Sequence, residues 1–217
     1  MKYTTAIFDL DGTILDTLED LKNSVNFALT ESHCPERTVD EVRRFVGNGI
    51  FLLIKRAVPE GSDETLVNTV FGSFKAHYAE HCADNTREYD GISSMFRALR
   101  EKGIKIAVVS NKADFAVQEL CKQYFPGLID IALGEREGVK KKPAPDSVNE
   151  VLCKLHADRD MSVYIGDSDV DIMTAKNAAV DCISVTWGFR SREFLISSGA
   201  DVLADNVSSL YEAVVGE

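Results

Sequence analysis

Two aspartates, Asp9 and Asp11, stand near the start of the chain, directly after a short apolar run and directly before a glycine and a threonine. Carboxylates in such a pair can hold a hard metal ion or move protons, although acids at this place can also simply end a strand. The glycine lets the chain turn. In open α/β sheets ligands bind beyond the carboxyl ends of the strands, so the pair predicts a ligand site if the preceding run is a buried strand.

Three further segments carry polar groups at the ends of predicted elements. Ser110 follows an apolar run and has a hydroxyl that can donate to a phosphoryl oxygen or cap the strand end. Lys142 supplies a positive charge, and the proline after it restricts its backbone to extended geometry, which separates it from the solvated run at residues 140–141. Asp167 follows another apolar run, and Asp171 stands where a helix would begin and where the helix dipole also favours an acid.

Four acidic residues, Asp9, Asp11, Asp167 and Asp171, would repel one another if they shared one crevice without a partner. A divalent cation removes that repulsion. Magnesium prefers oxygen ligands and commonly bridges one or two carboxylates to a substrate phosphate. The set therefore predicts Mg²⁺ as the cofactor. Such an ion, together with Lys142, would attract an anionic substrate to an acidic chain.

Apolar runs rich in Val and Ile alternate with segments of helical spacing over most of the chain. The predicted strands are Thr5–Leu10, Lys105–Ser110, Ile129–Leu133, Ser162–Gly166 and Cys182–Thr186. The predicted helices are Gly91–Lys102, Ala113–Tyr124, Asp146–Leu155 and Asp171–Ala179. Strands without polar alternation fit a sheet covered on both faces, and strands that alternate with helices favour parallel pairing. We therefore predict an α/β fold, with a Rossmann-like parallel sheet and helices on both faces.

The stretch from residue 16 to residue 84 breaks this alternation, because it shows helical spacing and no convincing strand. Four apolar side chains recur on one helical face: Leu18, Leu21, Val25 and Leu29. Thr38 and Glu41 form a capping box before a second helix, and Ser62 can cap a third. We predict a small all-helical domain at residues 16–84, inserted after the first strand into an α/β core of residues 1–15 and 85–217.

The polar motifs occur in an order that resembles the haloacid dehalogenase-like superfamily of phosphatases. The first is D-L-D-G-T at residues 9–13, after the N-terminal strand. The others are V-V-S-N-K at residues 108–112, K-P-A-P at residues 142–145 and G-D-S-D-V-D at residues 166–171. The resemblance spans nearly the whole chain, and the ordered set of four is far more specific than any one motif.

This resemblance implies a magnesium-dependent phosphatase that acts through an aspartyl-phosphate. Asp9 would be the nucleophile, and Asp11 the general acid and base. The implied magnesium ligands are the side chains of Asp9 and Asp167 and the backbone carbonyl of Asp11, while Asp171 would orient a metal-bound water or Lys142. The implied phosphoryl-binding groups are the Ser110 hydroxyl, the backbone N–H of Asn111 and the Lys142 ammonium.

The helical insertion resembles the mobile cap of the phosphoglycolate phosphatase-like branch, a lid that excludes water and selects substrates. In the segment F-V-G-N-G, Gly47 and Gly49 would permit close backbone approach, and Asn48 could reach a leaving group. A helix end followed by a new helix start is the alternative. Lys112 and the segment T-W-G-F-R at residues 186–190 also resemble this branch.

The implied activity is hydrolysis of a small phosphomonoester, similar to phosphoglycolate. If the substrate carries a carboxylate, the cap should supply a cation. The candidates are Arg43, Arg44, Lys55 and Arg56.

Other interpretations of the same residues stay open. A phosphomutase of the β-phosphoglucomutase type, or a pyrophosphatase on the same core, would share the nucleophile and the metal. A non-enzymatic binding module would not need the whole catalytic set, and a dehalogenase would need neither Asp11 nor a metal. His77 and His81 match the zinc motif H-x-x-E-H, but no third ligand stands at a reliable spacing, and histidine is favourable near the end of a helix.

Composition limits the classes of partner. The 217-residue chain is 45% hydrophobic and has 35 acidic against 24 basic side chains. It should fold, and its negative charge disfavours nucleic acid and membrane as partners. The partner that the resemblance implies is a small phosphate ester. No apolar run approaches the roughly 20 residues of a spanning helix and no signal peptide is evident, so we expect a cytoplasmic protein. The five cysteines lack a C-x-x-C pair and should be reduced thiols, and the sequence does not report the oligomeric state.

Overall fold

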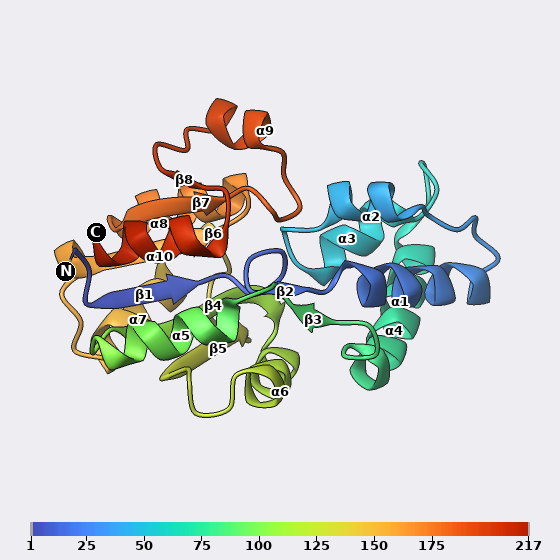
Figure 1. The fold of residues 1–217 in the computed structure, drawn as a ribbon. Helices are drawn as coiled ribbons and strands as arrows, with labels where there is room; N and C mark the ends of the chain where they lie inside the picture. Colours follow the sequence, from blue (N-terminus) through green and yellow to red (C-terminus); the bar gives the residue numbers. More distant parts are fainter. Residues whose placement is uncertain (1, 217) are drawn as a thin grey trace. The chain divides into compact units, whose positions relative to one another are not determined.

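The structure is a computed structural model that describes residues 2–216 (Figure 1). The chain divides into two compact units. The first, here called the sheet unit, consists of residues 1–15 and 88–217. The second, called the helical unit, consists of residues 16–87.

The sheet unit is built on a parallel sheet with the strand order β5-β4-β1-β6-β7-β8. Its strands are β1 (Thr5–Phe8), β4 (Lys105–Ala113), β5 (Ile131–Glu135), β6 (Ser162–Gly166), β7 (Asp181–Val185) and β8 (Leu203–Ala204). Phe8, the last residue of β1, aligns with Val108 on one side and with Ile165 on the other. Because these neighbours are parallel, the carboxyl ends of β1, β4 and β6 lie at one edge of the sheet.

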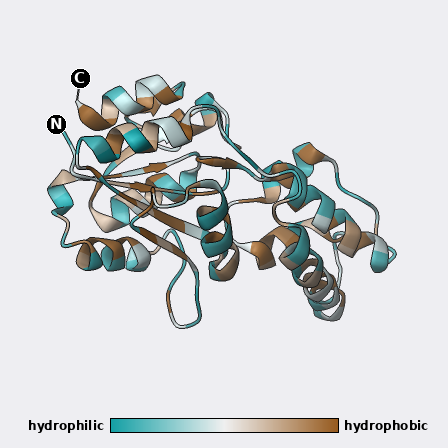
Figure 2. Ribbon diagram, turned by 60° about the horizontal axis from the view of Figure 1, so that its bottom comes forward, coloured by the Kyte–Doolittle hydropathy of each residue, from teal (hydrophilic) through white to brown (hydrophobic). Residues whose placement is uncertain are grey.

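Helices connect the strands and cover the sheet. They are α5 (Ile92–Glu101), α6 (Asp114–Tyr124), α7 (Asp146–Lys154), α8 (Asp169–Ala178), α9 (Arg192–Ser197) and α10 (Val207–Val215), with a 3₁₀ turn, η1 (Arg159–Met161). Figure 1 shows α5 and α10 on one face of the sheet and α7 and α8 on the other. Figure 2 shows the strands mostly in the brown of hydrophobic residues, as expected for a sheet covered on both faces. The predicted α/β fold class is confirmed.

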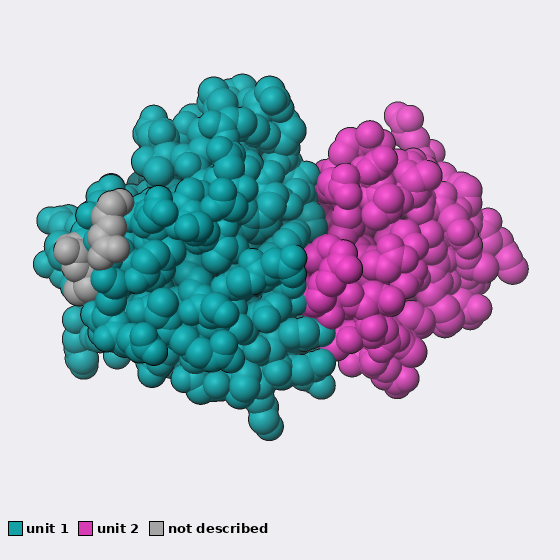
Figure 3. All heavy atoms as spheres, viewed as in Figure 1, with its two compact units in different colours: residues 1–15, 88–217 teal, residues 16–87 magenta. Residues whose placement is uncertain are grey.

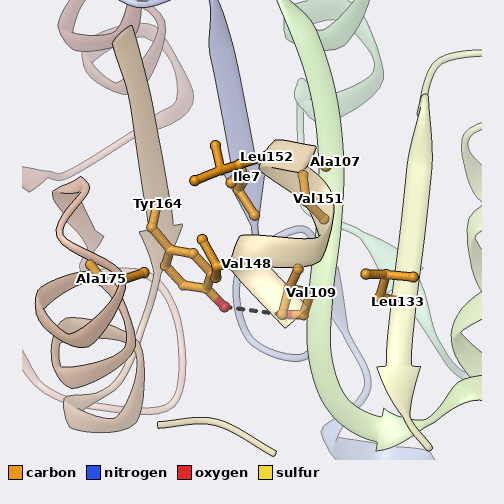
Figure 4. Packing of buried hydrophobic residues seen from close by; sticks show 10 residues of the cluster. Ile7, Ala107, Val109, Leu133, Val148, Val151, Leu152, Tyr164 and Ala175 are labelled. Carbon is orange, nitrogen blue, oxygen red and sulfur yellow. Dashed lines mark hydrogen bonds between the residues drawn. The ribbon is translucent and has the colours of Figure 1, made fainter. Parts of the chain in front are cut away.

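One cluster of buried side chains ties the central strands to α7 (Figure 4). It includes Ile7, Val109 and Tyr164 from the strands and Val148 and Val151 from α7, none of them more than 1% exposed. Each fully buried aliphatic side chain contributes roughly 1.5–3 kcal/mol to folding. Because β1, β4 and β6 share this core, their carboxyl ends keep fixed positions.

Several boundaries differ from the predicted ones. β4 continues to Ala113, beyond its predicted end, with an irregular register against β5. α8 begins at Asp169 and not at Asp171, because Ser168 caps it: the Ser168 hydroxyl accepts from the Asp171 N–H, and the Asp171 carboxylate accepts from the Ser168 N–H. The sequence patterns also miss α9, β8 and α10, which follow the last predicted strand.

The helical unit (Figure 3) contains α1 (Leu18–Glu31), α2 (Val39–Phe45), α3 (Ile50–Ala57) and α4 (Glu64–His81). Within it, α1 packs along α4. Thr38 caps α2 in the predicted capping box with Glu41. The prediction for α4 is wrong by one residue, because Asp63 accepts from the Leu66 N–H, whereas the Ser62 hydroxyl donates to a carbonyl in the preceding turn.

The chain passes between the units in two short segments. These are β2 (Leu15–Asp16) and β3 (Arg87–Glu88), which form a separate two-stranded sheet. Across residues 2–216, none of the helices has both the length and the apolar character that a membrane crossing requires.

Candidate active site

The carboxyl end of β1 carries the first predicted acid, Asp9. Its N–H donates to the carbonyl of Ile165 in β6 (2.8 Å), so the sheet still holds this residue although β1 ends before it. One carboxylate oxygen accepts from the N–H of Leu10 (2.7 Å). Gly12, at φ +82°, then turns the chain, and its N–H donates to the carbonyl of Leu15 (2.8 Å). Both the backbone and the carboxylate of Asp9 are therefore fixed at the strand end.

Three buried carboxylates meet at this edge of the sheet. One oxygen from each of Asp9, Asp167 and Asp171 lies within 4.8 Å of the others. Burial raises the pKa of Asp9 to about 7, a shift that the Lys142 ammonium opposes and the charge of Asp171 increases. Burial, together with the charges of Asp171 and Asp9, holds the pKa of Asp167 well above its usual range. Three carboxylates this close together would repel one another if all were ionised and no positive charge neutralised them.

Lys142 is a buried cation in contact with this cluster. Its Nζ lies 2.8 Å from Oδ1 of Asp9 and 2.7 Å from Oδ1 of Asp171, and it donates to the Tyr164 hydroxyl (3.0 Å). Burial alone would lower the pKa of Lys142, but the charges of Asp171 and Asp9 outweigh burial and hold that pKa well above its usual value. The lysines at residues 140–141 are exposed, so only the third lysine of this run lies in the site.

Tyr164, in β6, is a site residue that the sequence patterns miss. Its hydroxyl accepts from Lys142 and lies 3.0 Å from the Val109 carbonyl of β4 (Figure 4) and 3.3 Å from Oδ1 of Asp171. A phenol has one proton, so it donates to one of these two acceptors at a time. A tyrosine within an otherwise apolar strand is the signal that could have found it, because a buried phenol usually needs a polar partner.

Ser110 and Asn111 lie near the end of β4, the strand beside β1. The Asn111 side chain brackets the backbone of Lys142: its Oδ1 accepts from the Lys142 N–H (2.8 Å) and its Nδ2 donates to the Lys142 carbonyl (3.0 Å). The Ser110 hydroxyl accepts from the N–H of Lys112 (3.2 Å). The predicted phosphate contact of Asn111 uses its backbone N–H, so its side chain has the separate role of holding Lys142.

Lys112 forms a second buried ion pair. Its Nζ lies 2.9 Å from Oδ1 of Asp11, and the two side chains are 2% and 15% exposed. Asp11 is therefore the more accessible partner, and its carboxylate is not part of the three-carboxylate cluster.

Asp167 is enclosed by the turn after β1 and the loop after β7. Its Oδ2 accepts from the N–H of Phe189 (2.6 Å), and the Thr13 hydroxyl lies 3.4 Å from its Oδ1. A Cβ at Gly12 would lie 2.5 Å from Oδ2 of Asp167, and a Cβ at Gly188 would lie 2.3 Å from its Cβ. Neither position has room for a side chain. The loop after β7, known from the sequence only by resemblance, thus directly holds an acid of the site.

Both carboxylate oxygens of Asp171 are bound within the protein. Oδ1 contacts Lys142 and Tyr164. Oδ2 accepts from the N–H of Ser168 (3.1 Å) and from its hydroxyl (2.6 Å). These contacts occupy the lone-pair positions of the carboxylate, so Asp171 suits the expected role of orienting Lys142 better than that of a direct metal ligand.

The donor set fits a hard divalent cation. Asp9 and Asp167 offer buried carboxylate oxygens, and no nitrogen or sulfur ligand belongs to the one cluster found among residues 2–216. Burial raises the pKa of both carboxylates, so a positive charge between them would favour their ionised forms. Oxygen-only ligands with few carboxylates are the usual environment of Mg²⁺. Asp9, Asp167 and the carbonyl of Asp11 could hold it.

The predicted cap residues make contacts within the helical unit. Arg43 pairs with Asp40 (3.1 Å) on the surface. Arg56 donates to the carbonyl that ends α2 (2.7 Å) and to Oδ1 of Asn48 (2.9 Å). Gly49, at φ 89°, precedes α3. The loop of residues 45–49 is thus a helix end followed by a new helix start, and substrate contacts by its residues stay a prediction.

The two histidines of the possible zinc motif lie near the end of α4. The rings of His77 and His81 stack with 4.3 Å between their centres. Ser24 Oγ lies 3.0 Å from Nδ1 of His77, and Asp84 Oδ2 lies 2.7 Å from Nδ1 of His81. Within the part of the chain that the structure describes, neither histidine belongs to a cluster of three metal-binding side chains. The zinc interpretation gains no support.

Comparison with known proteins identifies the class. The family model of the haloacid dehalogenase-like hydrolases matches residues 6–185. A phosphoglycolate phosphatase from Agrobacterium fabrum is 31% identical and aligns with 96% of this chain and 91% of its own length. One from Vibrio parahaemolyticus is 32% identical, with 95% and 94% covered. A crystal structure from Lactobacillus delbrueckii subsp. bulgaricus, provisionally assigned as a phosphoglycolate phosphatase, has a TM-score of 0.95 at 43% identity and covers 100% of both chains.

The chain therefore belongs to the haloacid dehalogenase-like hydrolases. Within this family it falls in the phosphoglycolate phosphatase-like branch and is a phosphoric monoester hydrolase. The predicted family and enzyme class are confirmed, and the family implies a small phosphate ester as the substrate.

Proposed function

We propose that this hydrolase cleaves a small, phosphoglycolate-like phosphomonoester in a magnesium-dependent reaction through an aspartyl-phosphate on Asp9. The observation that carries this proposal is the position of Asp9 at the end of the central strand, 2.8 Å from Lys142 and within 4.8 Å of Asp167 and Asp171. A carboxylate that can act as a nucleophile thus lies beside a buried cation that can hold a phosphoryl oxygen. The similarity to phosphoglycolate phosphatases supports the substrate class.

In the first step, a carboxylate oxygen of Asp9 attacks phosphorus in line with the ester oxygen. The bond between phosphorus and the ester oxygen breaks, and that oxygen takes a proton from the carboxyl of Asp11. The groups proposed to hold the other phosphoryl oxygens are Ser110, Asn111 through its N–H, and Lys142. Because Lys142 already contacts Asp9, it can move that contact to a phosphoryl oxygen while Asp171 keeps it in place.

In the second step, water attacks the phosphorus of the aspartyl-phosphate. Asp11, now a carboxylate, takes a proton from that water. The bond between phosphorus and the Asp9 oxygen breaks, inorganic phosphate leaves, and both residues return to their starting forms.

The proposed Mg²⁺ ligands are the side chains of Asp9 and Asp167 and the carbonyl of Asp11. When bound there, the ion would supply the positive charge that neutralises the carboxylates and the transferred phosphoryl group. The residues around it have their own tasks: Phe189 and Thr13 hold Asp167, and Asp171 orients Lys142.

We further propose that residues 16–84 form a cap that excludes water and selects the substrate. Its candidate substrate residues are Gly47, Asn48, Gly49, Arg43 and Arg56. Since Arg56 donates to Asn48, its first role would be to shape the loop that carries this amide.

The test is phosphate release from 2-phosphoglycolate, pyrophosphate, a sugar phosphate and a nucleoside monophosphate, each with Mg²⁺ and with EDTA. We expect the highest kcat/KM for 2-phosphoglycolate and no turnover in EDTA. Asp9→Asn should lower phosphate release by about 10³-fold or more, since it removes the nucleophile. Asp146→Asn, the same change at an exposed acid on α7, is the matched control and should keep full activity.

The covalent step has its own readout. Acid-quenched single turnovers of the wild type should contain protein-bound phosphate that hydroxylamine releases, and Asp9→Asn should contain none. Unchanged phosphate release by Asp9→Asn would reject the nucleophile. A sugar phosphate isomer formed in place of inorganic phosphate would instead indicate a mutase.

A further inference from the structure

Lys112 is a buried cation that neither the metal nor the phosphoryl group requires. Its side chain is 2% exposed, and its ammonium lies 2.9 Å from Asp11. Removing an ammonium group from water is strongly unfavourable unless a partner or a ligand compensates for it. Asp11 is that partner in the structure. Since Lys142 already lies beside Asp9 for the phosphoryl group, Lys112 is not needed for that task and could bind a different part of the substrate.

The contacts of Lys112 place it on the leaving-group side of the proposed reaction. Its N–H donates to the hydroxyl of Ser110, a proposed phosphate ligand. Its ammonium contacts Asp11, the proposed proton donor to the leaving oxygen. A general acid must come within about 2.6–3.2 Å of the oxygen that it protonates. An ammonium paired with that acid is therefore close to the leaving oxygen and to groups on the adjacent carbons.

A carboxylate on the leaving group would compete with Asp11 for the ammonium of Lys112. An ammonium has three protons and can donate to a substrate carboxylate together with Asp11 or in place of it. That contact is charge-assisted and lies in a buried environment, where such hydrogen bonds are strong. A neutral leaving group offers no such acceptor, so Lys112 keeps its contact with Asp11 and gains no charge-assisted hydrogen bond to the substrate.

We propose that Lys112 is a specificity-determining residue that selects esters with a carboxylate beside the ester oxygen, by exchanging its contact with Asp11 for one with that carboxylate. This inference rests on the proposed phosphatase function. The carboxylate-binding cation would then lie in β4, whereas the sequence predicts it in the helical unit. The cations predicted from the sequence for this role were Arg43, Arg44, Lys55 and Arg56, of which Arg56 is already bound to Asn48.

The experiment compares kcat/KM for 2-phosphoglycolate with that for its neutral isostere, 2-phosphoglycolamide. Wild-type protein should prefer the carboxylate by about 10- to 100-fold, which is what one charge-assisted hydrogen bond provides. Lys112→Met keeps most of the side-chain stem without the charge and should reduce the preference to within about threefold. Lys112→Arg should keep part of it. Lys122→Met, at an exposed lysine on α6, is the control and should keep the full preference.

An unchanged ratio in Lys112→Met, even with lower rates for both esters, would overturn the proposal, because a lysine that only positions Asp11 or supports the fold affects both esters alike. If Lys112→Met does not fold, calorimetric binding of glycolate and glycolamide to the wild type decides. Tighter binding of glycolate supports the proposal, and equal binding overturns it. Selective glycolate binding by a protein that hydrolyses neither ester would contradict the proposed function but keep the carboxylate site.

Discussion

Lys142 must keep one orientation beside several carboxylates, and the Tyr164 phenol helps to fix it. The phenol oxygen accepts from the ammonium and lies 3.0 Å from the Val109 carbonyl in the neighbouring strand. Through this phenol, the Lys142 ammonium is connected to the backbone of β4. Without the hydroxyl, a buried ammonium proton and a buried carbonyl would each lose a partner, and an unsatisfied buried polar group costs about 1–3 kcal/mol.

We therefore expect Tyr164→Phe to lower the free energy of unfolding by about 1–3 kcal/mol and kcat/KM by about tenfold, measured by urea unfolding and steady-state kinetics. Tyr3→Phe is the matched control, because Tyr3 is also buried and donates to Asp181 (2.6 Å). It should lose stability without losing activity. If the two variants had the same kinetics, Tyr164 would serve the fold alone.

Asp11 and Asp167 differ in which atoms they would offer to the metal. Asp11 would use its backbone carbonyl, whereas Asp167 would use its side chain, which Phe189 and Thr13 hold. Asp11→Asn should then lower turnover by about 10²-fold or more and leave Mg²⁺ affinity within a few-fold, while Asp167→Asn should lower that affinity by at least about tenfold. Calorimetric titration of each variant with Mg²⁺ measures the difference. An equal loss of affinity would contradict the role given to Asp11.

Among the elements, the loop after β7 is as important to the site as the strands that carry the acids. Gly188 lies against Asp167, where a Cβ would be 2.3 Å from the Asp167 Cβ and 2.4 Å from the carbonyl of Gly12. The next residue, Phe189, donates its N–H to Oδ2 of Asp167. A methyl group at position 188 would push the loop and this N–H away, and the carboxylate would lose its orientation.

Gly188→Ala should therefore lower the free energy of unfolding by about 1–3 kcal/mol and weaken Mg²⁺ binding by about tenfold. Calorimetry and urea unfolding give the two values. Gly72→Ala is the control, because Gly72 lies inside α4 with nothing within 4 Å of an added Cβ, and alanine favours a helix. A Gly188→Ala protein with wild-type affinity for Mg²⁺ would show that the loop does not position Asp167.

For the whole molecule, sequence patterns predict the sheet and its acids because both are encoded locally. Asp9 and Asp167 each follow a short apolar run, and parallel pairing brings the ends of these runs to one edge whatever the helices do. Two of the elements after β7 are too short for a period to show: α9 has 6 residues and β8 has 2. The third, α10, has 9 residues, as many as the predicted α7, so length does not explain why it is missed. The cap role of residues 16–84 and the catalytic assignments stay predictions.

Local patterns could not assign roles to the remaining site residues, although the resemblance singles out Lys112 and the segment that contains Gly188, because these roles depend on contacts between distant segments. The Tyr164 hydroxyl is hydrogen-bonded to the carbonyl of Val109, and the Lys112 ammonium is hydrogen-bonded to the carboxylate of Asp11. Gly188 matters because of Asp167, which lies in a different loop. In the sequence alone, a lysine in β4 and a glycine after β7 are compatible with many structural roles. The contacts in the folded structure show which role each one has.

The buried carboxylates also set how the stability of the whole molecule depends on pH and metal. Burial raises the pKa of Asp9 from its ordinary value of 3.8 to about 7, so between these pH values the unfolded chain releases a proton that the folded chain keeps. The folded state then binds more protons than the unfolded state, and stability without metal falls as pH rises through this window. The raised pKa of Asp167 acts in the same direction.

Metal binding reverses this trend, because Mg²⁺ competes with the protons on Asp9 and Asp167. A Mg²⁺ concentration of about 100 times Kd would stabilise the protein by about 2.7 kcal/mol, so the increase in Tm on adding a fixed concentration of Mg²⁺ should be larger at pH 8 than at pH 6. Thermal unfolding at both pH values, with Mg²⁺ and with EDTA, measures it. In Asp167→Asn, a tenfold weaker affinity leaves about 1.4 kcal/mol of this stabilisation, so the increase should fall to about half or less at both pH values. A Tm increase that is equal at the two pH values, or that is undiminished in this variant, would mean that the ion binds outside the carboxylate cluster.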